Sequence, residues 1–188
     1  MLVILRPAVV LLGVLCLSSA DAFAQDDTDR IAEVICVGDP ECLAIAKHRL
    51  TADNLRRMFA VDRELVALMK QVPDLEKRMD ELARSLDPER RLGKVTLSAQ
   101  VHDGIPEIAL ILRKHKTTGR EYLMTHAVAA VTAMTYGSLP PEARRGGRNE
   151  MLEGIMTPGL KFWLSMDPAL KAEAEAWRKM RGYDELNR

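Results

Sequence analysis

Residues 118–137, TGREYLMTHAVAAVTAMTYG, restrict the fold more than any other part of the chain. Apart from the N-terminus this is the longest apolar run, and its few small polar residues cannot form a fully solvated face. A helix that is apolar over most of its circumference is normally buried by neighbouring helices. Thr118 and Glu121 have the spacing of a capping box, and Gly137 with two following prolines is typical of a helix end. We therefore expect a central helix over residues 119–136.

Composition places the chain among ordinary globular proteins and argues against some partners. Of its 188 residues, 47% are hydrophobic, and 27 Lys and Arg balance 27 Asp and Glu. A net charge of zero without a block of like charge does not favour a broad electrostatic contact with nucleic acid or anionic lipid. The aromatic content of 4% provides few platforms for stacking bases. We expect no nucleic-acid partner.

The N-terminus has the pattern of a signal peptide over residues 1–24. Arg6 is followed by the uncharged apolar run 8–17 and by the A-x-A pattern that ends at Ala24, so cleavage after Ala24 would leave Gln25 first. The run is shorter than the roughly 20 residues that span a bilayer, which disfavours a permanent anchor. The sequence therefore predicts a periplasmic or secreted protein with no stable membrane insertion after cleavage.

The two remaining cysteines, Cys36 and Cys42, are expected to form a disulfide. Cys16 lies within the predicted signal peptide, and the bulky Leu15 before it disfavours a lipoprotein cleavage site. An even pair of cysteines in an exported chain is typical of a disulfide. A redox or metal pair is the alternative, but redox motifs are usually C-x-x-C and zinc sites need four ligands. We expect an N-terminal helical turn closed by this bond.

Several further helices are predicted from periodicity and capping. A short helix should end near Ile35, and Asp39-Pro40 should begin another that runs to about Arg49. Leu50-Thr51 opens an amphipathic helix, and Pro73 separates it from a second that ends near Asp87. The apolar face of the first has spacings of three and four, and it consists of Leu55, Met58, Phe59, Asp62, Leu65, Val66, Met69 and Val72.

Residues 94–104 are ambiguous because apolar and polar side chains alternate, with the period of a half-buried strand. The chain contains no second convincing strand, and a lone strand would leave its backbone groups unpaired. We predict a short helix or an irregular connector here. An extended segment would imply pairing with another copy of the protein.

The rest of the chain is also expected to be helical. A helix over residues 107–116 should form a hairpin with the central helix, and further helices are expected over residues 149–156 and after Pro158 and Pro168. The loop from Arg144 to Arg148 is interpreted as a soluble connector, with anion binding as the alternative. The fold class is therefore all-α, an irregular bundle of six or more helices in one domain, residues 25–188.

Three stretches together carry a family resemblance. Leu50-Thr51 opens a long helix, Ile105-Pro106-Glu107-Ile108 opens another, and residues 118–122, Thr-Gly-Arg-Glu-Tyr, precede an alanine-rich helix. In this order the chain resembles small exported bacterial helical proteins to which no activity is attached. The resemblance spans about half of the chain and implies an envelope location and an all-α fold.

No catalytic or metal-binding motif occurs in the sequence. The histidines, His48, His102, His115 and His126, are scattered, and we expect only His126 to be buried, as a hydrogen-bonded core residue beside Thr125 or a facing helix. The alternative is a metal- or haem-binding bundle that uses His126 and core methionines. Methionines more often fill irregular helical cores. We expect no cofactor and no catalytic residue.

The sequence thus predicts a non-enzymatic, exported helical protein that binds a protein or small ligand, with an envelope protein as the expected kind of partner. The closely spaced bulky residues Phe162, Trp163 and Met166 could form a contact surface, although core packing is the favoured interpretation. A hydrolase whose residues converge only in the folded chain is a third hypothesis.

Overall fold

The computed structural model of the chain describes residues 36, 38–144 and 157–183, and these are helical with no strand among them. The all-α fold class is therefore confirmed. The helices are α2 (Pro40–Lys47), α3 (Ala52–Gln71), α4 (Leu75–Leu86), α5 (Lys94–Gly104), α6 (Pro106–Lys114), α7 (Gly119–Ser138), α8 (Pro141–Arg144), α10 (Pro158–Ser165) and α11 (Pro168–Met180). The predicted signal peptide, the helices expected near Ile35 and over 149–156, and the loop from 145 to 148 lie outside the described residues.

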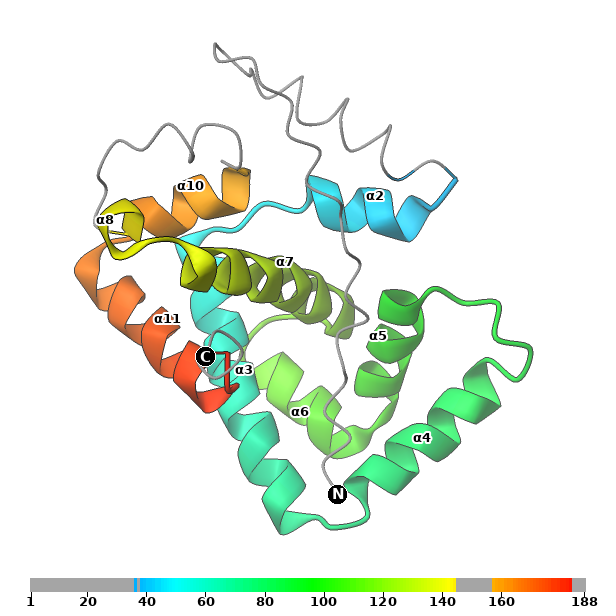
Figure 1. The fold of residues 1–188 in the computed structure, drawn as a ribbon. Helices are drawn as coiled ribbons and strands as arrows, with labels where there is room; N and C mark the ends of the chain where they lie inside the picture. The colour runs from blue at the N-terminus through cyan, green and yellow to red at the C-terminus, as the bar shows by residue number, and fades with distance from the viewer. Residues whose placement is uncertain (1–35, 37, 145–156, 184–188) are drawn as a thin grey trace.

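Helix α7 is the central helix of the bundle, as the sequence predicted. Figure 1 shows it crossing the molecule with α2 and α10 above it and α3, α5 and α6 below. Within α7 only Arg120, Val131 and Ser138 are exposed, and they lie on one narrow strip of its surface. The helix ends two residues later than expected, at Ser138, because Gly137 is a buried part of its last turn.

The expected capping box at the start of α7 is only half formed. The Thr118 hydroxyl accepts the Glu121 N–H at 3.1 Å. The Glu121 carboxylate does not return to the Thr118 backbone, and it accepts instead from the Arg57 guanidinium of α3 at 2.8 Å. A complete capping box is present at α3, where Thr51 and Asn54 exchange hydrogen bonds. Side-chain caps therefore fix the starts of both long helices.

Two glycines allow neighbouring helices to approach α7 closely. A methyl group added at Gly119 would lie 2.7 Å from the carbonyl oxygen of Ala99 in α5. At Gly159 in α10 it would lie 2.6 Å from the Thr132 hydroxyl of α7. A Cβ atom at either position would lie too close to these atoms unless they moved, so glycine allows the close approach.

The ambiguous segment 94–104 is helix α5, in agreement with the helical alternative. It packs against α4 and α6 as well as α7, so apolar residues are needed on more than one side and no simple helical period results. The main neighbour of α7 is α5, whereas α6 contacts α7 at only a few residues. The helical hairpin of α6 and α7 is therefore a minor part of the packing.

Phe162, Trp163 and Met166 pack in the core, as the favoured interpretation predicted, and do not form the alternative contact surface. Trp163 is fully buried, Met166 is 8% exposed, and Phe162 is partly buried against the core. Trp163 lies against Tyr136 of α7 and Trp177 of α11, with ring centroids 6.4 Å apart in both cases. These residues hold α10 and α11 on α7, so the core interpretation applies.

The N-terminal turn contains the expected disulfide between Cys36 and Cys42, whose Cα atoms are 5.4 Å apart. Within the loop, the Asp39 N–H donates to the Cys36 carbonyl, and Gly38 has a φ of 76°, which favours glycine. The Asp39 carboxylate then caps α2. None of the described helices is long and apolar enough to cross a membrane.

Candidate functional site

The apolar face of α3 contains one carboxylate, Asp62, which is fully buried. A buried charge is costly unless opposite charge and hydrogen bonds compensate for the lost water. The groups that provide this compensation come from α7, α11 and the turn after α11. We call Asp62, Tyr122, His126, Trp177 and Arg181 the Asp62 cluster.

Both oxygens of the Asp62 carboxylate are fully engaged. Oδ1 accepts the Tyr122 hydroxyl, and it also accepts Arg181 Nη2 at 2.5 Å. Oδ2 accepts the Trp177 indole Nε1 at 2.5 Å and Arg181 Nε at 3.0 Å. Arg181 is thus bidentate, the arrangement that best matches a carboxylate. The four bonds join α3 and α7 to the end of α11.

The position of Arg181 is set by the end of α11. The N–H of Tyr183 donates to the Arg178 carbonyl, and the N–H of Gly182 donates to the Lys179 carbonyl. This is a Schellman motif, and Gly182 has the positive φ of 72° that the motif requires. The motif also directs Arg181 back toward Asp62.

His126 is the one member of the cluster whose Nε2 atom forms no hydrogen bond with the described residues. Its Nε2 atom is buried, has no hydrogen-bond partner, and is 3.6 Å from Asp62 Oδ2. The prediction of a hydrogen-bonded core histidine was therefore wrong at this atom. The neighbouring Thr125 hydroxyl bonds instead to Nε2 of His48, at 2.9 Å. The inward carboxylate of the facing helix α3, Asp62, accepts instead from Tyr122, Trp177 and Arg181.

The electrostatics of the cluster follow from burial and from the single Asp–Arg pair. Burial alone would raise the pKa of Asp62, but the charge of Arg181 and the hydrogen bonds from Arg181 and Trp177 lower it below its ordinary value. Burial raises the pKa of Tyr122 well above its ordinary value. Asp62 is therefore ionised, Tyr122 is neutral, and Arg181 balances the buried charge.

The histidines near the cluster are held neutral by burial. Burial lowers the pKa of His126, although Asp62 acts in the opposite direction. Burial also lowers the pKa of His102, whose Nδ1 lies 2.7 Å from the Ser98 carbonyl oxygen. The His102 and Tyr122 ring centroids are 5.8 Å apart, and the rings are tilted by 41°. The sequence did not predict the partial burial of His102, because the alternating pattern of α5 gave no inward face.

The chemistry that this arrangement favours is structural rather than catalytic. A general base needs an oxygen or nitrogen that can reach a substrate proton. Each carboxylate oxygen of Asp62 already accepts two hydrogen bonds from protein donors. Among the described residues, no group of three or more His, Cys, Asp or Glu side chains could hold a metal ion. Among the methionines that the structure describes, Met69 and Met180 are exposed, at 41% and 38%.

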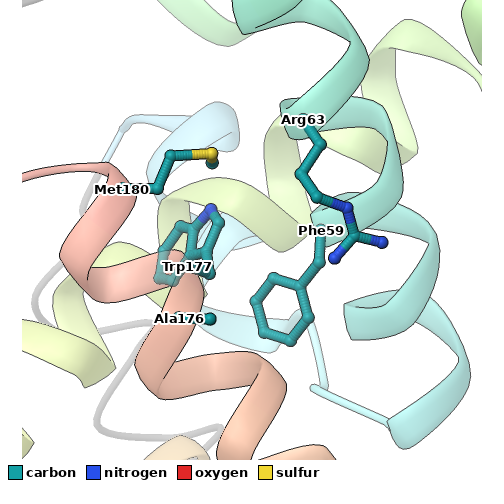
Figure 2. A pocket seen from close by; sticks show the side chains of 5 residues that line it. All are labelled: Phe59, Arg63, Ala176, Trp177 and Met180. Atoms are coloured by element: carbon teal, nitrogen blue, oxygen red, sulfur yellow. The ribbon is translucent and has the colours of Figure 1, made fainter.

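A small apolar hollow lies in front of the cluster, between α3 and α11. Figure 2 shows its walls, with Phe59 and Arg63 on one side and Ala176, Trp177 and Met180 on the other. Its volume is about 50 Å³, far below the roughly 300 Å³ of small ligand pockets. Trp177, which lines this hollow, donates its indole N–H to Asp62, and Asp62 itself is not among the lining residues.

A larger depression lies at the other end of the molecule, where the N-terminal turn meets the start of α5. We call it the Arg120 depression, and its volume is about 580 Å³. Gly38, Asp39, Pro40, Glu41, Arg91, Leu92, Gly93, Thr96 and Arg120 line it. Arg91 pairs with Glu89, whereas the exposed Arg120 forms no ion pair or hydrogen bond with the described residues. The sequence did not indicate this depression because its walls come from separate segments.

Comparison with protein-family models, with curated proteins and with solved structures found no match to this chain.

Proposed function

We propose that the mature protein, residues 25–188, is exported to the periplasm and acts there as a non-enzymatic binding protein. The signal-peptide pattern before Gln25 and the Cys36–Cys42 disulfide support export, because disulfides persist in oxidising compartments. The buried carboxylate of Asp62 supports a non-enzymatic role, because its hydrogen bonds are used to join three segments of the fold.

The observation that carries the proposal is the exposed Arg120, which pairs with none of the described residues. A volume of about 580 Å³ lies within the range of small-ligand sites. The acidic residues at its wall are already engaged, Asp39 by the start of α2 and Glu41 by the start of α5. The guanidinium of Arg120 is therefore the group that can take a carboxylate or phosphate of a ligand or envelope protein.

Cell fractionation tests the export part of this proposal. We expect the full chain to be recovered in the periplasm with Gln25 as its first residue. Recovery in the cytoplasm with Met1 retained would contradict export.

Site-specific photo-crosslinking tests the binding part. A photoreactive amino acid replaces Leu92, which lines the depression, in one variant, and Lys179, exposed at the end of α11, in the control, so that Arg120 stays in place in both. We expect one adduct of defined mass from position 92, which the further change Arg120→Ala removes, and none from position 179. The same adducts from both positions, or none from position 92, would contradict binding at the Arg120 depression.

A second candidate function is a metal- or haem-binding bundle that uses His126. The buried Nε2 of His126, which lacks a hydrogen-bond partner, favours it. The visible absorption spectrum and metal content of the protein purified from periplasm test this candidate. A Soret band or a stoichiometric metal that His126→Gln removes would support it, and a colourless, metal-free protein would exclude it.

A further inference from the structure

The carboxylate of Glu41, in the first turn of α2, lies at the N-terminus of α5. Its Oε2 accepts the N–H of Val95 at 3.0 Å, and its Oε1 accepts the N–H of Thr96 at 2.7 Å and the Thr96 hydroxyl at 2.9 Å. The partners are 54 and 55 residues apart in the chain. Glu41 thus joins the N-terminal turn to the body of the bundle.

Helix α5 needs this carboxylate because it has no cap of its own. The first N–H groups of a helix have no acceptor within the helix, and the N-cap side chain usually supplies one. The N-cap of α5 is Gly93, which has no side chain. A Cβ atom at Gly93 would lie 2.5 Å from Glu41 Oε1, so glycine leaves the space that the carboxylate occupies. The Glu41 side chain of α2 therefore supplies the hydrogen-bond acceptor that the N-cap residue of α5 lacks.

The disulfide lies directly beside this cap. Cys42 follows Glu41, and its bond to Cys36 closes the turn in which Asp39 accepts the N–H groups of both Glu41 and Cys42, at 2.9 and 3.0 Å. The short closed loop limits the orientations that the first turn of α2 can take. The disulfide and the Glu41 cap therefore constrain the same few residues.

We propose that the Cys36–Cys42 disulfide is a redox-sensitive control of the junction between α2 and α5. A dithiol reductant transfers two electrons and two protons to the two sulfur atoms, which become thiols, and the dithiol becomes a disulfide. The released turn gains conformational freedom, and Glu41 leaves the start of α5 for part of the time. The Val95 and Thr96 N–H groups then lose their acceptor, and the wall of the Arg120 depression that Glu41 forms opens.

Residue-resolved hydrogen exchange on the full chain, oxidised and then reduced with dithiothreitol, tests this inference. We expect reduction to accelerate exchange of the Val95 and Thr96 amides about tenfold, in line with the loss of an N-cap. The amide of Ala129, in the buried middle of α7, should exchange at the same rate in both states. Unchanged exchange of Val95 and Thr96 on reduction would overturn the inference.

Two variants show whether the effect passes through Glu41. In Glu41→Ala these amides should exchange rapidly in both redox states, so that reduction adds nothing. In Glu81→Ala, an exposed glutamate on α4, the response to reduction should match that of the unmodified chain. An equal acceleration on reduction in Glu41→Ala would overturn the role of the cap. The comparison of the two redox states of the unmodified chain remains decisive if Glu41→Ala does not fold.

Discussion

Asp62 and Trp177 are 115 residues apart in the chain, yet the Trp177 indole donates to the buried Asp62 carboxylate at 2.5 Å. This bond, with the bidentate contact from Arg181, joins the last described helix to the longest helix of the first half. The contact is made inside the core, where an unpaired partner would be costly. The stability of the fold should therefore depend on the contacts of Asp62 with Trp177 and Arg181 and on the packing around α7.

Replacement of Asp62 should destabilise the fold strongly. Asp62→Ala leaves the Arg181 guanidinium, the Trp177 N–H and the Tyr122 hydroxyl without their acceptor, so we expect a loss of about 3 kcal/mol in the free energy of unfolding. Urea denaturation measures this loss. The control is Asp53→Ala on the same helix, where the carboxylate is 84% exposed and a change within about 0.5 kcal/mol is expected. Equal losses in the two variants would contradict the role of Asp62.

Stability should fall as the pH is lowered through the histidine range. The pKa of His126 in the folded state is below its ordinary value of 6.5, because burial disfavours its charged form. The unfolded chain therefore takes up the proton first, and stability present above about pH 6.5 is lost as the pH falls toward the folded-state pKa. His102 acts in the same direction.

The urea midpoint measured from pH 7.5 to 5.5 checks this pH dependence. We expect the free energy of unfolding obtained from these urea curves to decrease by at most about 1.4 kcal/mol per pH unit for each histidine. His126→Gln should make the free energy of unfolding depend less on pH, because this variant lacks the imidazole. Arg181, whose charge also lowers the pKa of His126, is unchanged in the variant. A midpoint that stays constant over this range would refute the assignment of His126 as neutral.

A methyl group at Gly119 should be harder to accommodate than one at Gly159. In Gly119→Ala the new atom meets the backbone carbonyl oxygen of Ala99, which can move only if α5 shifts. We expect a loss of about 2 kcal/mol, typical of overpacking. In Gly159→Ala the nearest atom is the Thr132 hydroxyl, which can rotate, so the loss should be smaller. Thermal unfolding of both variants decides the order, and the reverse order would contradict the packing of α5 on α7.

Trp163 should contribute to stability rather than to partner binding. It is fully buried between α7 and α11, so Trp163→Ala should cost about 3–5 kcal/mol in the free energy of unfolding. Leu110, which is 62% exposed on α6, serves as the control, and Leu110→Ala should cost less than about 1 kcal/mol. A Trp163→Ala protein as stable as the unmodified chain would show that this side chain is on the surface.

The sequence predicted the helices well because their determinants are local. Thr51, Asp39-Pro40 and Asp167 each begin a helix through a cap a few residues from the groups it bonds. Segment 94–104 was predicted correctly as non-strand, but only because the chain offers no strand to pair with it. Its alternating pattern reflects contacts on several sides of α5.

The candidate sites could not be predicted because their residues are distant in the sequence. The position of Asp62 on an apolar face was visible, and a lone carboxylate there indicates a buried partner. Its donors, however, follow 60, 115 and 119 residues later, and no local pattern connects them. The cap that Glu41 provides to α5 is equally non-local. The same reasoning explains why residues 162–166 were considered as a surface, since only the fold shows Trp163 to be enclosed.

The contact of Arg181 with Asp62 has a consequence for biosynthesis. A ribosome or a translocation channel releases a chain N-terminus first, so α3 emerges long before the residues that neutralise its carboxylate. Until the final turn follows, the apolar face of α3 remains unshielded, and a nascent chain that stops short of residue 181 lacks the arginine. The Asp62 cluster can therefore form only after residue 181 has been delivered.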